Sequence, residues 1–225
     1  MIKQIIWDVD GTLYKSVPEF NLYFKQAYVN ILKTHFPQEE EGVLWEKYEV
    51  KKRETKSSTE ALHQLTGATF TTLGQIFEEA VPRREFIKID DHLITLFQTL
   101  HDKGIQSFAL RNGVTEGTKS IIRLIGLDRL IFADCEFGPF QKVLGVFDNF
   151  ETAKPSLKPF QYFLNELGLK AEETLSVGDR VAVDLVPAKK LNIQTALVWS
   201  TPKEEEKEYV DFVLPDVYSV ISLFK

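Results

Sequence analysis

Two carboxylates, Asp8 and Asp10, follow the apolar run Ile2–Trp7 near the start of the chain. A short apolar run that stops at acidic residues and a glycine is typical of a buried strand that enters a loop. Residues two apart in extended backbone share a face, so both carboxylates point the same way. Converging carboxylates repel unless a cation or a shared proton lies between them, and Mg²⁺ prefers such oxygen ligands. An acidic turn without a metal is the alternative that this motif alone leaves open.

Further polar residues complete a candidate phosphate site. Asp179 follows the strand-like run Thr174–Val177, Asp184 comes five residues later, and Lys154 precedes another expected helix. Acids after two separate strands, together with a lysine, predict a metal, a nucleophile and a fixed positive charge in one place. Taken singly, Lys154 is typical of a surface lysine, and Asp184 is typical of an acid that interacts with a helix dipole.

The elements that must position these residues alternate between strands and helices. Strand-like runs occur at 2–7, 105–110, 174–177, 195–199 and 210–214, and helix-like segments at about 91–104, 115–125, 160–167, 183–191 and 217–224. This alternation predicts an α/β fold: a Rossmann-like parallel sheet with helices on both faces. Ligands of such sheets bind beyond the carboxyl ends of the strands, where the acids stand.

Residues 15–86 show helix-like patterns only, in contrast to the alternation of strands and helices elsewhere. Pro18 opens a helical segment with one apolar stripe, and further helix-like segments follow at 43–53, 59–65 and 72–80 without a good strand among them. We therefore expect an all-helical cap domain at 15–86, inserted after the first strand of a core domain formed by 1–14 and 87–225.

Composition narrows the class of protein. A net charge of −6 over 225 residues argues against a nucleic acid polymer as the main partner, since phosphate backbones demand a basic face. The single cysteine, Cys135, excludes an intrachain disulfide and favours a reducing cytoplasm. One cysteine and four scattered histidines do not make a zinc site, and no apolar run reaches the roughly 18 residues that cross a membrane.

Three motifs together resemble the haloacid dehalogenase (HAD) superfamily of aspartyl phosphohydrolases. They are DVDGTL at 8–13, KPSLKPF at 154–160, and GDRVAVD at 178–184 ahead of AKKLNI. Their order and spacing fit the whole chain. A helical insertion directly after the first motif resembles the cap of the subgroup that contains phosphoglycolate phosphatase, β-phosphoglucomutase and haloacid dehalogenase.

The resemblance implies a magnesium-dependent phosphatase that acts on a small phosphorylated metabolite. By it, Asp8 attacks phosphorus and becomes an aspartyl phosphate, and Asp10 protonates the leaving oxygen and then activates water. The implied Mg²⁺ ligands are Asp8, Asp10 through its backbone carbonyl, and Asp179, with Asp184 in or near the shell. Lys154 would offset the charge of the nucleophile and the phosphoryl group. Haloacid dehalogenases lack the second acid, so Asp10 favours a phosphatase.

One position departs from the family pattern. The second motif normally ends a strand with Ser or Thr before Asn, whereas this chain has Arg111 before Asn112. A guanidinium can contact phosphate, so we expect Arg111, Asn112, Thr12 and Lys154 to bind the substrate, with altered turnover or substrate choice. The segment 133–150 is also longer than usual, and its two apolar runs around Gly138 are compatible with a hairpin.

Three other functions stay open at this stage. A phosphomutase would use the same residues and return the phosphoryl group to its substrate. A weakly active or non-catalytic phosphate-binding protein is suggested by Arg111. A receiver-type signalling domain also combines acids, Mg²⁺ and a lysine, but it is disfavoured by the 70-residue insertion. The residue pattern does not indicate which phosphorylated substrate is used or the oligomeric state.

Overall fold

A six-stranded parallel sheet forms the centre of the computed structural model, which describes residues 1–55 and 57–224. The strand order is β3-β2-β1-β4-β5-β6, and every neighbouring pair is parallel. The first strand therefore lies between β2 and β4, at the point where the strand order reverses and where open α/β sheets bind ligands. The strands are β1 (Gln4–Trp7), β2 (Gln106–Arg111), β3 (Lys142–Gly145), β4 (Thr174–Gly178), β5 (Gln194–Val198) and β6 (Phe212–Leu214).

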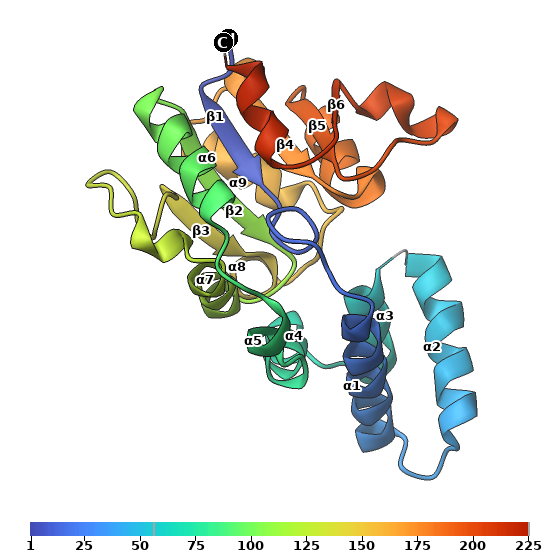
Figure 1. Cartoon of the computed structure of the whole chain (residues 1–225). Helices are drawn as coiled ribbons and strands as arrows, with labels where there is room; N and C mark the ends of the chain where they lie inside the picture. Colours follow the sequence, from blue (N-terminus) through green and yellow to red (C-terminus); the bar gives the residue numbers. More distant parts are fainter. Residues whose placement is uncertain (56, 225) are drawn as a thin grey trace.

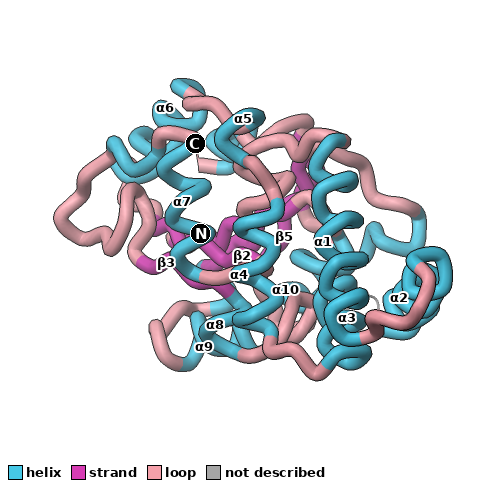
Figure 2. The backbone as a smooth tube through the Cα atoms, turned by 90° about the horizontal axis from the view of Figure 1, so that it is seen from below, coloured by secondary structure: helices cyan, strands magenta, loops and turns pink. Residues whose placement is uncertain are grey.

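Helices cover both faces of the sheet (Figure 2), which confirms the predicted α/β class. Successive residues of β1 point to opposite faces, so Ile5 and Trp7 join one apolar cluster and Ile6 joins the other. The first cluster packs against α6 (Asp91–Asp102), α7 (Thr115–Leu124) and the 3-10 helix η5 (Tyr218–Leu223). The second packs against α9 (Lys158–Asn165) and α10 (Val186–Lys189).

Among the residues that the structure describes, five helices lie between β1 and α6. They are α1 (Glu19–His35), α2 (Glu41–Thr55), α3 (Ser58–Thr66), α4 (Phe70–Ala80) and α5 (Arg83–Phe86). Figure 1 shows α1, α2 and α3 side by side, away from the sheet, with α4 and α5 nearer to it. Side chains fix two of the starts, because Ser57 accepts a hydrogen bond from the backbone N–H of Glu60 and Thr69 accepts one from that of Thr72.

Helix α4 joins the inserted helices to the sheet. On its sheet side, Gly74 allows close approach, since an added Cβ would stand 2.8 Å from Phe147 of α8 (Val146–Phe150). On its other side, the rings of Phe77 and Phe24 of α1 lie 6.0 Å apart in an edge contact. The second apolar cluster therefore runs without a break from the sheet through α4 into α1, α2 and α3.

The segment 133–150 supplies an edge strand. An antiparallel bridge joins Phe137 and Phe140 around the Gly138 turn, and the chain then enters β3, which pairs in parallel with β2. The hairpin suggested by the sequence is thus reduced to a single bridge. The sequence did not predict β3 as a strand of the sheet, because its apolar residues continue directly into the helix that begins at Val146.

The expected helices at 183–191 and 217–224 differ in type. The first is a π-helical turn, η3 (Val181–Leu185), followed by the short α10. Pro187 has no N–H to continue the α-helical hydrogen-bond ladder at this junction. The second is the 3-10 helix η5. The remaining 3-10 helices are η1 (Leu127–Arg129), η2 (Ala171–Glu173) and η4 (Glu204–Tyr209). None of the described helices is long and apolar enough to span a bilayer.

Candidate functional site

The carboxyl ends of three adjacent strands deliver the polar residues to one edge of the sheet. Asp8 follows β1 and its backbone N–H donates to the carbonyl of Val177 in β4 at 2.9 Å. Arg111 ends β2, and Asp179 follows β4. Because the strands are parallel and in register, residues that follow them in the sequence become neighbours in space.

Three of the predicted residues form an acidic cluster. Asp8, Asp179 and Asp184 offer carboxylate oxygens that lie within 4.8 Å of one another. Glycines make room for it, because a Cβ on Gly11 would collide with the Asp179 carboxylate and one on Gly178 with Asp184. Gly11 also has φ +86°, a conformation that other residues rarely adopt.

The carboxylates of the cluster are partly or fully buried and repel one another. Burial, followed by repulsion from Asp8, raises the pKa of Asp179 to about 7. Burial and repulsion from Asp184 likewise raise the pKa of Asp8. The Oδ1 atom of Asp179 is buried and has no hydrogen-bond partner among the described residues. An oxygen-only donor set in which one carboxylate oxygen accepts no hydrogen bond fits a hard divalent cation such as Mg²⁺.

Lys154 is the buried cation of the site. Its Nζ donates to Asp8 Oδ1 and to Asp184 Oδ1, both at 2.7 Å, and more weakly to the carbonyl of Leu110 at 3.3 Å. Burial alone would lower its pKa, but the charges of Asp184 and Asp8 outweigh this and raise it. Asn112 fixes the lysine backbone, since its Oδ1 accepts from the Lys154 N–H at 2.8 Å and its Nδ2 donates to the Lys154 carbonyl at 3.3 Å.

The remaining predicted residues divide into two groups. Thr12 is fully buried and donates through Oγ1 to Asp8 Oδ2 at 2.8 Å, so Asp8 is held at both oxygens. Asp10 is not a member of the acidic cluster. Its Oδ1 accepts from the hydroxyl of Tyr14, and its Oδ2 accepts from Arg111 Nε at 2.5 Å. Burial acts to raise the pKa of Asp10, but Arg111 and Arg83 outweigh it and hold the pKa at about 2.

Arg111 pairs with Asp10 and belongs to an ion-pair network that reaches the inserted helices. Its Nη1 donates to Glu78 Oε1 of α4, and Glu78 Oε2 accepts from Arg83 Nη1 of α5 at 3.0 Å. The Arg111 side chain is 3% exposed. It does not belong to the residues that line the neighbouring cavity. In this arrangement the guanidinium therefore contacts the second acid of the first motif.

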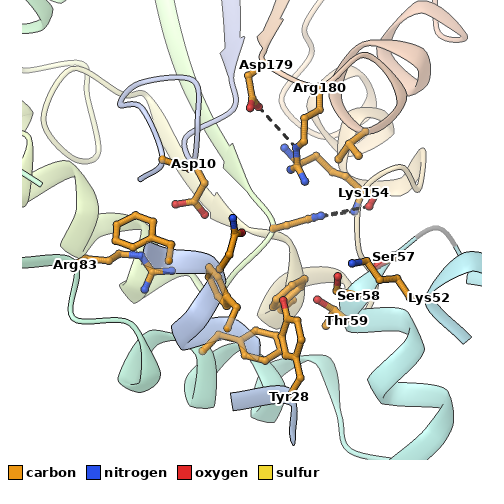
Figure 3. Close-up of a pocket in the computed structure, with 18 of the residues that line it drawn as sticks. Asp10, Tyr28, Lys52, Ser57, Ser58, Thr59, Arg83, Lys154, Asp179 and Arg180 are labelled. Atoms are coloured by element: carbon orange, nitrogen blue, oxygen red, sulfur yellow. Dashed lines mark hydrogen bonds and ion pairs between the residues drawn. The ribbon is translucent and has the colours of Figure 1, made fainter. Parts of the chain in front are cut away.

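A cavity of about 410 Å³ opens between the sheet edge and the inserted helices (Figure 3). Asp10, Lys154 and Asp179 line its inner end, and Arg180 lies beside Asp179 with Nε 3.7 Å from Oδ1. Its volume is in the range of small-molecule sites. The rest of the wall comes mainly from the insertion: Ser16, Phe20, Asn21, Phe24, Tyr28, Lys52, Ser57, Ser58, Thr59, Phe77 and Arg83.

The sequence analysis missed Glu78, Arg83 and Arg180. Arg180 carried a usable signal, because it stands directly after Asp179 in the motif at 178–184. Glu78 and Arg83 carried none, since charged residues in helix-like segments are usually solvated. Only the fold brings them to Asp10.

Comparison with known proteins identifies a family and several relatives. The family model described as haloacid dehalogenase-like hydrolase matches residues 2–192. A glyceraldehyde 3-phosphate phosphatase of Methanocaldococcus jannaschii is 26% identical over 235 residues, covering 100% of this chain and 98% of the relative. The pyrophosphatase PpaX of Halalkalibacterium halodurans is 27% identical over 132 residues, 56% of each chain. A HAD phosphatase structure from Thermococcus onnurineus has a TM-score of 0.65 and 18% identity, covering 99% of this chain and 97% of that one.

The buried position of Lys154 predicts a large stability cost for its removal. Lys154→Met leaves Asp8 and Asp184 buried without their shared cation, so the free energy of unfolding should fall by about 3–5 kcal/mol. The measurement is urea denaturation in the presence of a chelator. Lys3→Met is the matched control, because Lys3 pairs with Glu173 at 2.8 Å but its side chain is 59% exposed. It should cost less than about 1 kcal/mol. Equal losses in the two variants would contradict the electrostatic role of Lys154.

Proposed function

Since this chain belongs to the haloacid dehalogenase-like hydrolases and is a phosphoric monoester hydrolase, we propose that it releases phosphate from a small phosphorylated metabolite through an aspartyl phosphate on Asp8. The observation that carries the proposal is the set of contacts that surround the Asp8 carboxylate. Its carboxylate is oriented by Thr12 and Lys154 at one end of a small cavity, next to two further acids. The activities for which the relatives are named, on glyceraldehyde 3-phosphate and pyrophosphate, support a small phosphorylated substrate.

In the first proposed step, an oxygen of Asp8 attacks phosphorus and the bond between phosphorus and the ester oxygen breaks. The leaving oxygen takes a proton from Asp10. In the second step, water attacks the phosphorus of the aspartyl phosphate, Asp10 takes a proton from that water, and free phosphate leaves while Asp8 is restored. Lys154 keeps the nucleophile oriented and offsets negative charge beside the phosphoryl group.

We propose that Asp8, Asp179 and the backbone carbonyl of Asp10 hold Mg²⁺, with Asp184 in or near its shell. The Oδ1 of Asp179 accepts no hydrogen bond among the described residues, and this, with the mutual repulsion of the carboxylates, supports a cation at this place. When bound, Mg²⁺ would offset the negative charge of the phosphoryl group and its nucleophile. We also propose the core as 1–14 and 87–225, the cap as 15–86, and the cytoplasm as the location, the last on the evidence of the lone thiol of Cys135.

A weakly active phosphatase is the second candidate, and the contacts of Asp10 favour it. Both oxygens of this carboxylate accept hydrogen bonds, and its pKa of about 2 leaves it without the proton that the leaving oxygen needs. Fast turnover therefore requires the ion pair between Asp10 and Arg111 to break, so that Asp10 can carry a proton. The cap residue Glu78 shares Arg111 with Asp10, so cap and proton donor are connected.

Phosphate release from a panel of phosphomonoesters tests the proposed activity. The native protein with Mg²⁺ should release phosphate, whereas chelator should abolish release and Asp8→Asn should reduce it to the level of buffer, because no nucleophile remains. Asp10→Asn should lower the rate by about 10²–10⁴-fold, the usual contribution of acid–base help. Undiminished release from Asp8→Asn would refute the mechanism, and an isomerised ester without free phosphate would indicate a mutase.

Magnesium binding has a readout that does not depend on activity. Mg²⁺ at 100 times its dissociation constant should stabilise the native protein by about 2.7 kcal/mol in thermal unfolding. Asp179→Asn removes a metal ligand and one of three mutually repelling carboxylates. This variant should be at least as stable as the native protein in chelator and should lose most of the Mg²⁺ effect. An unchanged Mg²⁺ response would exclude Asp179 as a ligand.

Arg111→Ser separates restraint of Asp10 from contact with the phosphoryl group. The variant releases Asp10 from its ion pair, while Tyr14 and Arg83 still act on it. The value of kcat should therefore rise by about tenfold, less than the roughly 10²–10⁴-fold of full acid–base catalysis, while KM changes little. Arg129→Ser, at an exposed position in η1, is the control and should leave both constants unchanged. A raised KM with unchanged kcat would instead support the predicted contact between Arg111 and the substrate.

A further inference from the structure

We propose that Arg83 binds a carboxylate on the organic part of the substrate, so that the preferred substrates are short phosphorylated carboxylic acids. The inference rests on the proposed phosphatase function and specifies its substrate class. It begins from a buried hydrogen-bond donor that no described residue satisfies.

Arg83 is buried, with 6% of its surface exposed, and its charged group is only partly paired. Nη1 donates to Glu78 Oε2 at 3.0 Å, whereas Nε is fully buried without a partner among the described residues. A buried donor that makes no hydrogen bond costs about 1–3 kcal/mol, so native proteins rarely keep one without a ligand or another use for it.

The shape of the guanidinium indicates what would satisfy it. Glu78 engages Nη1, which leaves the edge formed by Nε and Nη2 for a further acceptor. Nε is closed to solvent in this arrangement, so an acceptor reaches it only with a shift of the Arg83 side chain. Two parallel N–H groups on one planar edge match the two oxygens of a carboxylate, and such charge-assisted pairs are about twice as strong as neutral ones. A hydroxyl or an aldehyde offers a single uncharged acceptor and satisfies this edge less well.

The position of Arg83 ties this edge to the proposed chemistry. Arg83 lines the same cavity as Asp10 and Lys154, and Figure 3 shows its guanidinium directed toward Asp10 from the side of the inserted helices. The guanidinium carbon lies 5.9 Å from the centre of the Phe24 ring, so its surroundings are partly apolar. A low local dielectric strengthens a charged hydrogen bond made there.

The charges around the cavity leave room for a second anionic group. Among the described residues, those of the inserted helices that line the cavity include two cations, Lys52 and Arg83, and no carboxylate, although Glu78 outside the lining pairs with Arg83. The proposed phosphoryl site uses Lys154 and the acidic cluster. The positive groups near the inserted helices therefore favour a substrate that carries negative charge at both ends.

Matched substrates and variants test the proposal. The substrate pairs are 3-phosphoglycerate with glyceraldehyde 3-phosphate, and phosphoglycolate with ethyl phosphate; within each pair the acid replaces an uncharged group. The native enzyme should have the higher kcat/KM for the acid of each pair. Arg83→Met also changes the charge beside Asp10, which affects all esters alike, so the measure is the ratio within each pair. The ratio of kcat/KM for the acid to that for the uncharged ester should fall by about 10- to 100-fold, as expected for one charged hydrogen-bonded contact.

Arg84→Met is the matched control, because Arg84 stands on the same helix and is exposed. It should leave the preference for acids unchanged. Arg83→Lys keeps the charge and removes the planar edge, so the preference should fall to an intermediate value. The ratio within each pair is insensitive to a loss of folded enzyme. An equal loss for acids and uncharged esters, or a native preference for the uncharged esters, would overturn the role of Arg83. Absence of phosphate release from every ester would instead refute the proposed function.

Discussion

The structure depends on one constraint, the confinement of negative charge at the carboxyl edge of the sheet. Asp8, Asp179 and Asp184 lie within one small space, and a single buried ammonium group, that of Lys154, joins two of them. Like charges are tolerated in a protein interior only where cations and hydrogen bonds offset them. The order of the parallel strands, the absence of a Cβ on Gly11 and Gly178, and the clamp of Asn112 on the Lys154 backbone all serve this arrangement.

A second charge network extends from this edge into the inserted helices. Arg111 stands where the family pattern has a hydroxyl, and it connects Asp10 with Glu78 rather than facing the cavity. Glu78 in turn holds Arg83. Asp10 is therefore linked through Arg111, and then through Glu78 to Arg83, to the inserted helices that line the cavity. In the proposed mechanism, the protonation of the leaving group and the recognition of the substrate involve one network.

The sequence was informative where signals are local and uninformative where contacts are distant. Apolar runs that stop at acids predicted β1 and β4, and the spacing of Asp179 and Asp184 predicted two members of the acidic cluster. The strand β3 was missed because its apolar residues run directly into those of α8, with no turn signal to separate strand from helix. The pairing of Arg111 with Asp10 and Glu78 joins residues 101 and 33 positions apart. No local pattern encodes such a pair; it exists only once α4 packs against the sheet.

The position of α4 also determines how the molecule can come apart. Gly74 and Phe77 place this helix in contact with α8 on one side and with α1 on the other, so one apolar interior serves sheet and insertion alike. Deleting 15–86 would uncover Phe147 and Val114, which now lie against α4. Sheet and insertion are therefore interdependent in folding. Heat or denaturant should melt them in a single cooperative transition, not module by module.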